Sequence, residues 1–360
     1  MNKIDRYILR HFLSTLVFSI GALSIVFVVV SLFEKMDDFI DHNTPGDIII
    51  KYYINYLPDI IKVLFPVGML LSALFTTGRL SNSNEITAMK AAGMSLYRYI
   101  TPLMVLAMML SIGQLYFNGW VVPNANRVKS DIEREYLKKG DDVTSFSRLD
   151  FRDAPLRNVR MGYYNDVSRR GSSMNIEVFT SEESPRIVSS FSSPRFTWSD
   201  SLNNWLMYEV TERRFSGDKH ELLFHDSLAA PVNITPHEII NMQRKSTELT
   251  FEELKHHIIL ASRGGEDVRR EWIDYYGQHA LPFANFIVVL FGIPFSGGKR
   301  KGGLALEIAA AMFIAFLYLV FTKVGQTVGY AANLDPVLSG WLANAVFLVA
   351  GIINIFRLRS

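Results

Sequence analysis

The chain has no cysteine among its 360 residues. This absence excludes a disulfide framework, a thiolate zinc site, a cysteine nucleophile and an acylated lipoprotein cysteine. A basic excess is also missing, because the net charge is only +2 and the region from Pro123 to Glu271 carries 22 basic against 24 acidic residues. Nucleic acid is therefore not an expected partner.

Charge is scarce over long parts of the chain. Of the 72 charged residues, 46 lie between Pro123 and Glu271, and five stretches elsewhere run for about 20 residues with at most one charge. A segment of about 20 mostly apolar residues is long enough to cross the hydrocarbon core of a bilayer. The pattern indicates an α-helical membrane protein with a large polar insertion. It predicts six transmembrane helices, at residues 12–33, 59–78, 100–122, 275–298, 302–322 and 336–356.

The first apolar run has a cleaved signal peptide as its alternative, because Lys3, Arg6 and Arg10 resemble a basic n-region. A signal-peptide core has roughly 7–15 apolar residues followed by a small-residue cleavage site. The run has 22 uncharged residues and no such site. A retained span is therefore favoured.

Lysine and arginine in the short loops predict the orientation, since basic residues are retained on the cytoplasmic side. The ends opposite to the two termini hold only Lys35, Lys51, Lys62 and Lys323. The ends on the side of the termini hold eleven cations, namely Lys3, Arg6, Arg10, Arg79, Lys90, Arg98, Lys299, Arg300, Lys301, Arg357 and Arg359. Both termini are therefore expected to be cytoplasmic, with the insertion on the far side of the membrane.

The polar insertion is too long to be a loop without structure of its own. Over residues 143–235, short alternating runs are separated by Asn, Asp, Ser, Gly and Pro, which is typical of an all-β sandwich or jellyroll. A helical stalk is expected at 124–139 and a second helix at 249–262, where Thr250 and Glu253 have capping-box spacing. The expected domains are a membrane half at 1–122, an inserted domain at 123–272 and a second membrane half at 273–360.

The strand runs contain apolar and aromatic residues that we expect to face the interior of the β domain. There they either fill a closed core or line a groove for acyl chains. They are Ile176, Val178, Phe179, Phe196, Trp198, Leu206 and Tyr208.

No complete catalytic motif is present. The segment from His237 to Asn241 begins like a zinc-protease helix, but asparagine replaces the second histidine ligand. The segment from Gly292 to Lys299 resembles a phosphate loop, but its lysine comes one place late and Arg300 replaces the hydroxyl residue that would hold magnesium. No G-x-S-x-G nucleophile motif occurs either. We expect no metal, no cofactor and no enzymatic activity of this chain itself.

The loop between the second and third spans predicts a short helix over residues 82–93. Asn82 and Glu85 have the spacing of a capping box, and Gly93 is a helix stop. Ile86 and Met89 form an apolar stripe on this helix. The stripe fits either a groove in a partner protein or the headgroup layer of the membrane.

Several motifs occur in a characteristic order along the chain. They are Asp5-Arg-Tyr-Ile8, Gly78-Arg-Leu, Glu85, Met89, Ala92-Gly93-Met-Ser, Asn118-Gly-Trp-Val-Val-Pro123, Leu249-Thr-Phe-Glu-Glu-Leu254 and Leu334-Asp-Pro336. Their order and spacing resemble the lipopolysaccharide-export permease family (LptF/LptG) over the whole chain. The first of them resembles the LptG branch more than the LptF branch.

The resemblance implies a function in the bacterial inner membrane. In that family two permeases pair, here with an LptF-like partner, and a dimeric LptB-like cytoplasmic ATPase engages the short helix of each. Lipopolysaccharide then leaves for a periplasmic jellyroll bridge of LptC-like and LptA-like proteins. Glu85 matches the acidic residue of the coupling helix, with Ile86 and Met89 beside it, so ATP would be hydrolysed on another chain.

Four basic residues near the membrane edge are candidates for lipid-headgroup phosphates, namely Lys35, Lys62, Arg127 and Arg134. Such cations bind phosphate through charge-assisted hydrogen bonds, and Lys35 matches a family lysine at the lipid entrance. The alternative is snorkelling or local pairing with Glu34, Asp59 or Asp131. A scaffold that recruits periplasmic partners without moving lipid is the alternative function.

Overall fold

The computed structural model describes residues 3–139, 144–181, 186–216, 219–264, 267–296 and 303–357. These form two compact units, a helical unit from residues 1–137 and 269–360 and a β unit from residues 138–268. Residues 297–302, where the predicted fourth span ends and the fifth begins, lie outside the described part, as do Lys299, Arg300, Lys301 and Arg359.

Five helical segments of the described chain are long and apolar enough to cross a membrane. These five segments correspond to five of the six predicted spans. Four of them are clearly longer than the predicted span, and the last agrees with its predicted bounds within one residue. The segments are α1 (Lys3–Asp41), α2 (Gly46–Asn82), the continuous run of α4 (Leu96–Tyr116), the π-helix η1 (Phe117–Val121) and α5 (Val122–Tyr136), then α10 (Gly303–Ala331) and α11 (Pro336–Arg357). The stalk expected at 124–139 forms most of α5 and belongs to the helical unit.

The fourth predicted span is divided. It consists of α8 (Arg269–Ala280), the 3₁₀ turn η3 (Leu281–Phe283) and α9 (Ala284–Ser296). Pro282 lies in the turn, and proline lacks the N–H that an α-helix interior needs. The 13 residues of α9 contact α2 and α4, so this segment lies inside the helical unit.

α2 is the most enclosed of the long helices. Its small residues Gly68, Ser72 and Thr76 are all buried. A Cβ at Gly68 would lie only 2.7 Å from Cγ1 of Ile20 on α1. The close approach that small residues permit is therefore used within this chain, between α1 and α2.

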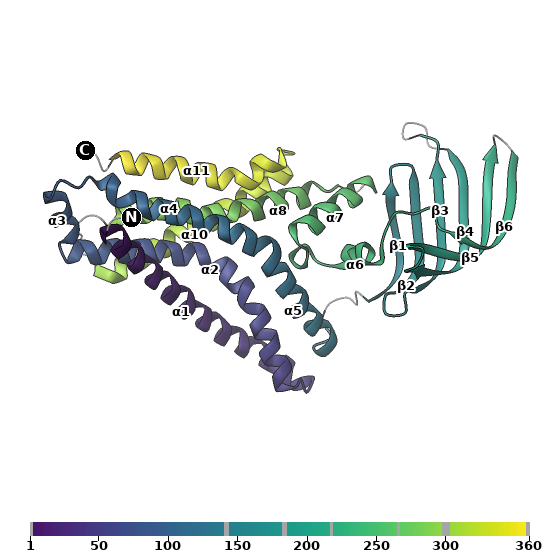
Figure 1. The fold of residues 1–360 in the computed structure, drawn as a ribbon, viewed down its shortest axis with the longest axis horizontal. Coiled ribbons are helices and arrows are strands. Elements are labelled where there is room, and N and C mark those ends of the chain that lie inside the picture. Colours follow the sequence, from purple (N-terminus) through teal and green to yellow (C-terminus); the bar gives the residue numbers. More distant parts are fainter. Residues whose placement is uncertain are drawn as a thin grey trace. The chain divides into compact units, whose positions relative to one another are not determined.

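The β unit holds one antiparallel sheet whose strands are paired in chain order (Figure 1). The strands are β1 (Ser145–Ala154), β2 (Arg157–Asn165), β3 (Arg170–Phe179), β4 (Ile187–Ser199), β5 (Asn204–Ser216) and β6 (Lys219–Ala229). The predicted fold class, a helical membrane protein with an inserted all-β domain, is confirmed. Within it the strand order is a simple meander, without the crossovers of a Greek key.

Two short helices complete the β unit, α6 (Pro236–Gln243) and α7 (Phe251–Arg263), with the 3₁₀ turn η2 (Ser246–Glu248) between them. The capping box predicted from Thr250 and Glu253 is present, and Thr235 and Glu238 form a second one. Each box supplies partners for backbone N–H groups that a helix start leaves open.

A row of residues across the sheet, which we call the crease, interrupts the pairing of all six strands. Arg148, Ser173 and Glu209 have positive φ angles of 66°, 58° and 54°. By register, Gly162, Pro194 and Asp226 lie opposite them in the same row. Positive φ is unusual for residues other than glycine, and its repetition in register marks a built feature of the sheet.

The crease changes which side chains face the core. In a regular strand such residues recur every second position. Across the crease the buried positions instead lie three apart, as in Met161 and Tyr164 on β2 and Met207 and Val210 on β5. β2 and β5 thereby keep an apolar face toward the core on both sides of the row.

The crease also corrects one prediction. Ile176 and Phe196 are buried in the core as expected. On β5, however, Trp205 and Met207 are fully buried, and the predicted Leu206 and Tyr208 are on the other face and only half-buried. Val210, on the other side of the crease, is buried as well, so the core-facing positions of β5 change from odd to even numbers at Glu209.

Candidate functional site

The short helix between α2 and α4 begins later than predicted. It is α3 (Glu85–Ala91), with Asn84 as N-cap at φ 58° and no side-chain capping hydrogen bond. The predicted capping box from Asn82 is wrong, because α2 continues through Asn82. The carboxylate of Glu85 instead accepts hydrogen bonds from Ser83 Oγ at 2.9 Å and Tyr7 Oη at 3.4 Å.

The end of α3 is a Schellman motif. The N–H of Met94 donates to the C=O of Met89, and the N–H of Gly93 donates to the C=O of Lys90, both at 3.0 Å. Gly93 has φ 83°, a conformation that glycine adopts without a Cβ penalty. The predicted helix stop at Gly93 is confirmed.

The apolar stripe of α3 is divided between the interior and the surface. Ile86 is only 7% exposed and belongs to the core of the helical unit. Met89 is half-buried, and it lines a small pocket with Met94 and Tyr99. Ile86 therefore anchors α3 to its own chain, and the solvent-facing side of α3 is formed by Glu85, Thr87, Ala88, Lys90 and Ala91.

Lys35 lies in a cluster formed by three helices. Its Nζ atom is 2.7 Å from Glu133 Oε1 on α5 and 2.5 Å from Tyr52 Oη on α2. Tyr52 Oη donates to the same Glu133 oxygen at 2.8 Å. The ammonium also lies 4.9 Å from the centre of the Tyr52 ring. We call Lys35, Tyr52 and Glu133 the Lys35 cluster.

Aromatic and apolar side chains pack against the Lys35 cluster. Tyr52 is fully buried, and Phe39 packs against it with the ring centroids 5.5 Å apart. Ile132 on α5 and Leu137, the residue that follows α5, belong to the same apolar cluster. The three polar groups are thus fixed by packing, and the side chains of Lys35 and Glu133 stay 27% and 20% exposed.

The other three candidate cations have separate surroundings. Arg134 pairs with Asp131 at 3.0 Å, one turn earlier on the same helix, which is the local alternative foreseen for it. The backbone C=O of Lys62 accepts a hydrogen bond from Gln114 Nε2 at 3.1 Å. Helical rise places Lys62 about 15 Å along α2 from Tyr52, and Arg127 about 9 Å along α5 from Glu133. The four cations therefore do not converge on one point.

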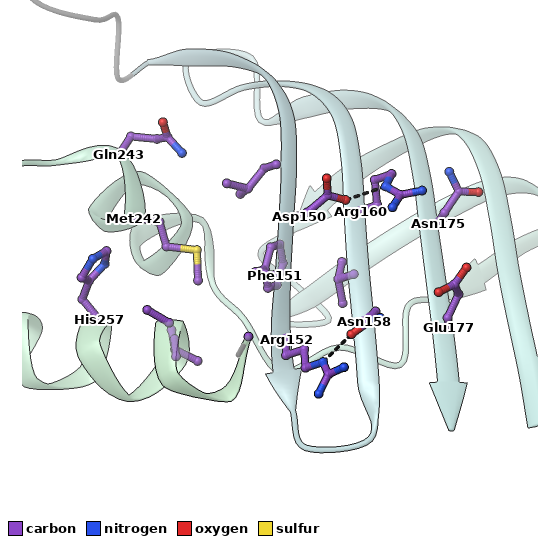
Figure 2. A pocket seen from close by; sticks show the side chains of 15 residues that line it. Asp150, Phe151, Arg152, Asn158, Arg160, Asn175, Glu177, Met242, Gln243 and His257 are labelled. Carbon is purple, nitrogen blue, oxygen red and sulfur yellow. Dashed lines mark hydrogen bonds and ion pairs between the residues drawn. The ribbon is translucent and has the colours of Figure 1, made fainter. Parts of the chain in front are cut away.

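A cavity of about 520 Å³ lies in the β unit beside α6 and α7 (Figure 2). Its arginines already have partners, since Arg152 Nε donates to Asn158 at 2.6 Å and Arg160 Nε to Asp150 at 2.5 Å. None of the seven residues predicted for an acyl-chain groove lines this cavity. Within the described ranges, no group of three His, Asp or Glu side chains is arranged to hold a metal ion.

A family model described as "Lipopolysaccharide export system permease LptF/LptG" matches residues 6–358. The chain belongs to this permease family. It is 20% identical to LptG of Haemophilus influenzae over 81% of each chain. It is also 20% identical to LptF of Escherichia coli over 97% of this chain and 93% of that protein. The two identities are equal, so they do not separate the two branches of the family.

Membership in the LptF/LptG family, together with the long apolar helices, makes this a multi-pass protein of the inner membrane. The match includes both units, so the β unit is part of the family architecture. Sequence reasoning missed two members of the Lys35 cluster, Tyr52 and Glu133. The available signal was the run of Tyr52, Tyr53 and Tyr56 close to a span end, since tyrosine is enriched at membrane interfaces.

Proposed function

We propose that this chain is the permease subunit of an ATP-driven transporter that extracts lipopolysaccharide from the inner membrane and passes it to a periplasmic β-jellyroll bridge. The observation that carries the proposal is the family match over residues 6–358, which spans the helical unit and the β unit together. ATP is hydrolysed on a separate LptB-like dimer, and an LptF-like permease completes the membrane part.

The coupling surface is α3. Glu85 and the exposed residues of α3 contact the ATPase, while Ile86, buried in the chain's own core, transmits the movement of α3 into the helical unit. Met89, half-buried at the boundary, is covered fully when the ATPase binds. A seven-residue helix has little stability of its own in water, so its attachment through Ile86 keeps this surface formed.

Lipid entry involves the cations Lys35, Lys62, Arg127 and Arg134, which lie on α1, α2 and α5. Because they are spread along the helices, they suit successive contacts with a large headgroup that carries several phosphates. Lys35 makes the first of these contacts. Both termini are cytoplasmic and residues 123–272 are periplasmic, as the distribution of basic residues in the loops requires.

Transfer of lipopolysaccharide to the periplasmic bridge uses the outer edge of β6. Within the described residues β6 pairs only with β5, so its outer edge has no partner strand. Leu222 and Phe224 on β6 are 45% and 77% exposed. A sheet edge with exposed apolar side chains accepts a strand of another protein by β-augmentation. An LptC-like domain, followed by an LptA-like bridge, would continue the sheet from this edge.

Purification of the tagged chain from its native membrane tests this proposal. We expect a nucleotide-binding ATPase to co-purify, and its ATP hydrolysis to increase when lipopolysaccharide is added. Recovery of periplasmic proteins alone, with no ATPase, would support a scaffold that moves no lipid and would refute the transport function.

A further inference from the structure

The two hydrogen bonds that Glu133 accepts in the Lys35 cluster both go to one carboxylate oxygen. Lys35 donates at 2.7 Å and Tyr52 at 2.8 Å, so Oε1 is the shared acceptor. The carboxylate is an anion held against an ammonium by charge-assisted hydrogen bonds. A phosphate monoester oxygen would make the same contacts with the same two donors.

Lys35 has capacity for a larger anion. An ammonium group has three N–H donors, and the described residues supply two acceptors, Tyr52 Oη and Glu133 Oε1. The lysine side chain is 27% exposed, so an anion can approach it. With Glu133 in place, however, that anion would meet a like charge at hydrogen-bonding distance from the same ammonium, which disfavours the approach.

We propose that Glu133 is a built-in competitor for lipid phosphate at Lys35, and that a phosphorylated headgroup binds by displacing the Glu133 carboxylate from the ammonium. The inference rests on the proposed function, because it takes Lys35 as a headgroup contact. Glu133 is then a specificity-determining residue. It holds Lys35 and Tyr52 in place when no lipid is bound, and only a ligand that outcompetes a carboxylate opens the cluster.

The exchange has a mechanical consequence, because Lys35, Tyr52 and Glu133 come from α1, α2 and α5. Their hydrogen bonds join the three helices at one level. Displacement of Glu133 removes its own polar contacts to α1 and α2, and leaves the hydrogen bond from Asn126 to Asp59 and the apolar contacts of Ile132. Headgroup binding thereby releases one constraint on the helix that precedes the β unit in the chain.

The test measures the dissociation constant for lipopolysaccharide with the full chain in nanodiscs at low ionic strength, where charge is least screened. The variants are Glu133→Gln, Lys35→Ala and the double variant. Glu135→Gln is the matched control, because it removes a carboxylate from the exposed side of the same helix. Dephosphorylated lipopolysaccharide and inorganic phosphate are the comparison ligands.

Glu133→Gln should tighten lipopolysaccharide binding by roughly three- to tenfold, while Glu135→Gln changes it little. The gain should vanish in the Lys35→Ala background and with the dephosphorylated lipid. A similar gain with inorganic phosphate would identify a general phosphate site at which lipid is one ligand, and the competition by Glu133 would still hold.

Two results would overturn the inference, and they differ in meaning. If Glu133→Gln binds lipopolysaccharide no better than wild type while Lys35→Ala binds it more weakly, Glu133 only supports the fold and the proposed headgroup role of Lys35 stands. If Lys35→Ala binds as tightly as wild type, the headgroup role fails and competition fails with it. Thermal unfolding of each variant separates either result from loss of folding.

Discussion

Glu212 is a carboxylate on the core-facing side of β5, and it is only 5% exposed. Its Oε1 atom accepts a hydrogen bond from Arg214 Nε at 2.5 Å, and Oε2 lies 2.9 Å from His225 Nε2 on β6. The hydrogen bond from Arg214 lowers the pKa of Glu212 below its ordinary value of 4.5, with His225 adding to the effect and burial opposing it.

This pKa shift predicts an acid-sensitive contribution to the stability of the β unit. Because the pKa of Glu212 is lower in the folded state, the ionised carboxylate stabilises the fold above pH 4.5, and that stabilisation is lost as the pH falls through the lowered value. Glu212→Gln should cost on the order of 1 kcal/mol at neutral pH and should weaken the loss of stability below pH 4.5. Hydrogen exchange of β5 and β6 amides in the full chain, measured against pH, checks this.

The control for Glu212 is Glu209→Gln. Glu209 pairs with Arg195, but both side chains are more than 60% exposed, and exposed pairs contribute roughly 0–1 kcal/mol. The account predicts an almost unchanged pH profile for this variant. If Glu212→Gln and Glu209→Gln gave the same profile, the buried pair would not be the source of the acid sensitivity.

At the residue scale, the sequence identified Lys35 as a candidate but not its partner. The foreseen alternatives were neighbours such as Glu34, because local pairing can be read from spacing. The actual partner, Glu133, is 98 residues away in the sequence. Such a contact follows from the packing of α1, α2 and α5, and no local pattern around Lys35 encodes it.

At the scale of elements, α3 is the part of the helical unit that most depends on its surroundings. It has seven residues and no side-chain N-cap, so Ile86 and the Schellman motif provide most of its fixation. Its start differs from the prediction because the sequence pattern of a capping box does not show whether the preceding helix has already ended. Its end agrees, because glycine at positive φ is a strong local signal.

Glu85→Lys is predicted to abolish coupling to the ATPase while the chain still folds. The carboxylate is half-buried and accepts hydrogen bonds from Ser83 and Tyr7, both at the surface, so its loss is tolerable within the chain. A lysine at this position would repel a basic partner surface that binds the carboxylate. ATPase co-purification and lipid-stimulated hydrolysis should both fall at least about tenfold. The control is Thr87→Lys, which places a lysine two residues further along α3 and shows whether coupling depends on the position of the new positive charge. Full coupling in Glu85→Lys would contradict the assignment of α3 as the docking surface.

Gly93→Ala should weaken the end of α3. A residue with a Cβ at φ 83° costs about 1–2 kcal/mol relative to glycine. Since nothing else lies within 4 Å of that position, the cost comes from the backbone alone. Reduced ATPase coupling with unchanged thermal stability of the long helices is the expected pattern. Coupling equal to wild type would show that the Schellman motif is dispensable.

The crease is the element that sequence reasoning could not foresee. Strand alternation predicts facing only while φ stays in the β region, and Arg148, Ser173 and Glu209 leave it. Neither arginine, serine nor glutamate signals a positive φ by its identity. The spans, in contrast, were predictable, because a long uncharged run has few alternatives to a transmembrane helix. The turn at Pro282, the π-helix at Phe117–Val121 and the extension of α1 and α2 beyond their apolar runs were not anticipated.

At the scale of the whole molecule, the chain combines an apolar helical unit with a β unit in one family architecture. Under the proposed function, the helical unit would offer cations to a headgroup and α3 to an ATPase. The β unit would offer its apolar side chains to acyl chains and the β6 edge, unpaired among the described residues, to a second sheet. The account requires that lipid passes from the first unit to the second and that ATP drives this passage.

The most direct test follows lipopolysaccharide within the chain. A photo-crosslinking amino acid replaces Leu223 on β6, in proteoliposomes that contain the chain with its co-purified partners and lipopolysaccharide. The account predicts that crosslinking of lipopolysaccharide to this position rises with time only when ATP is hydrolysed, and that Glu85→Lys prevents the rise. Equal crosslinking without ATP, or capture of protein partners alone, would contradict the claim that this chain is a lipopolysaccharide-exporting permease.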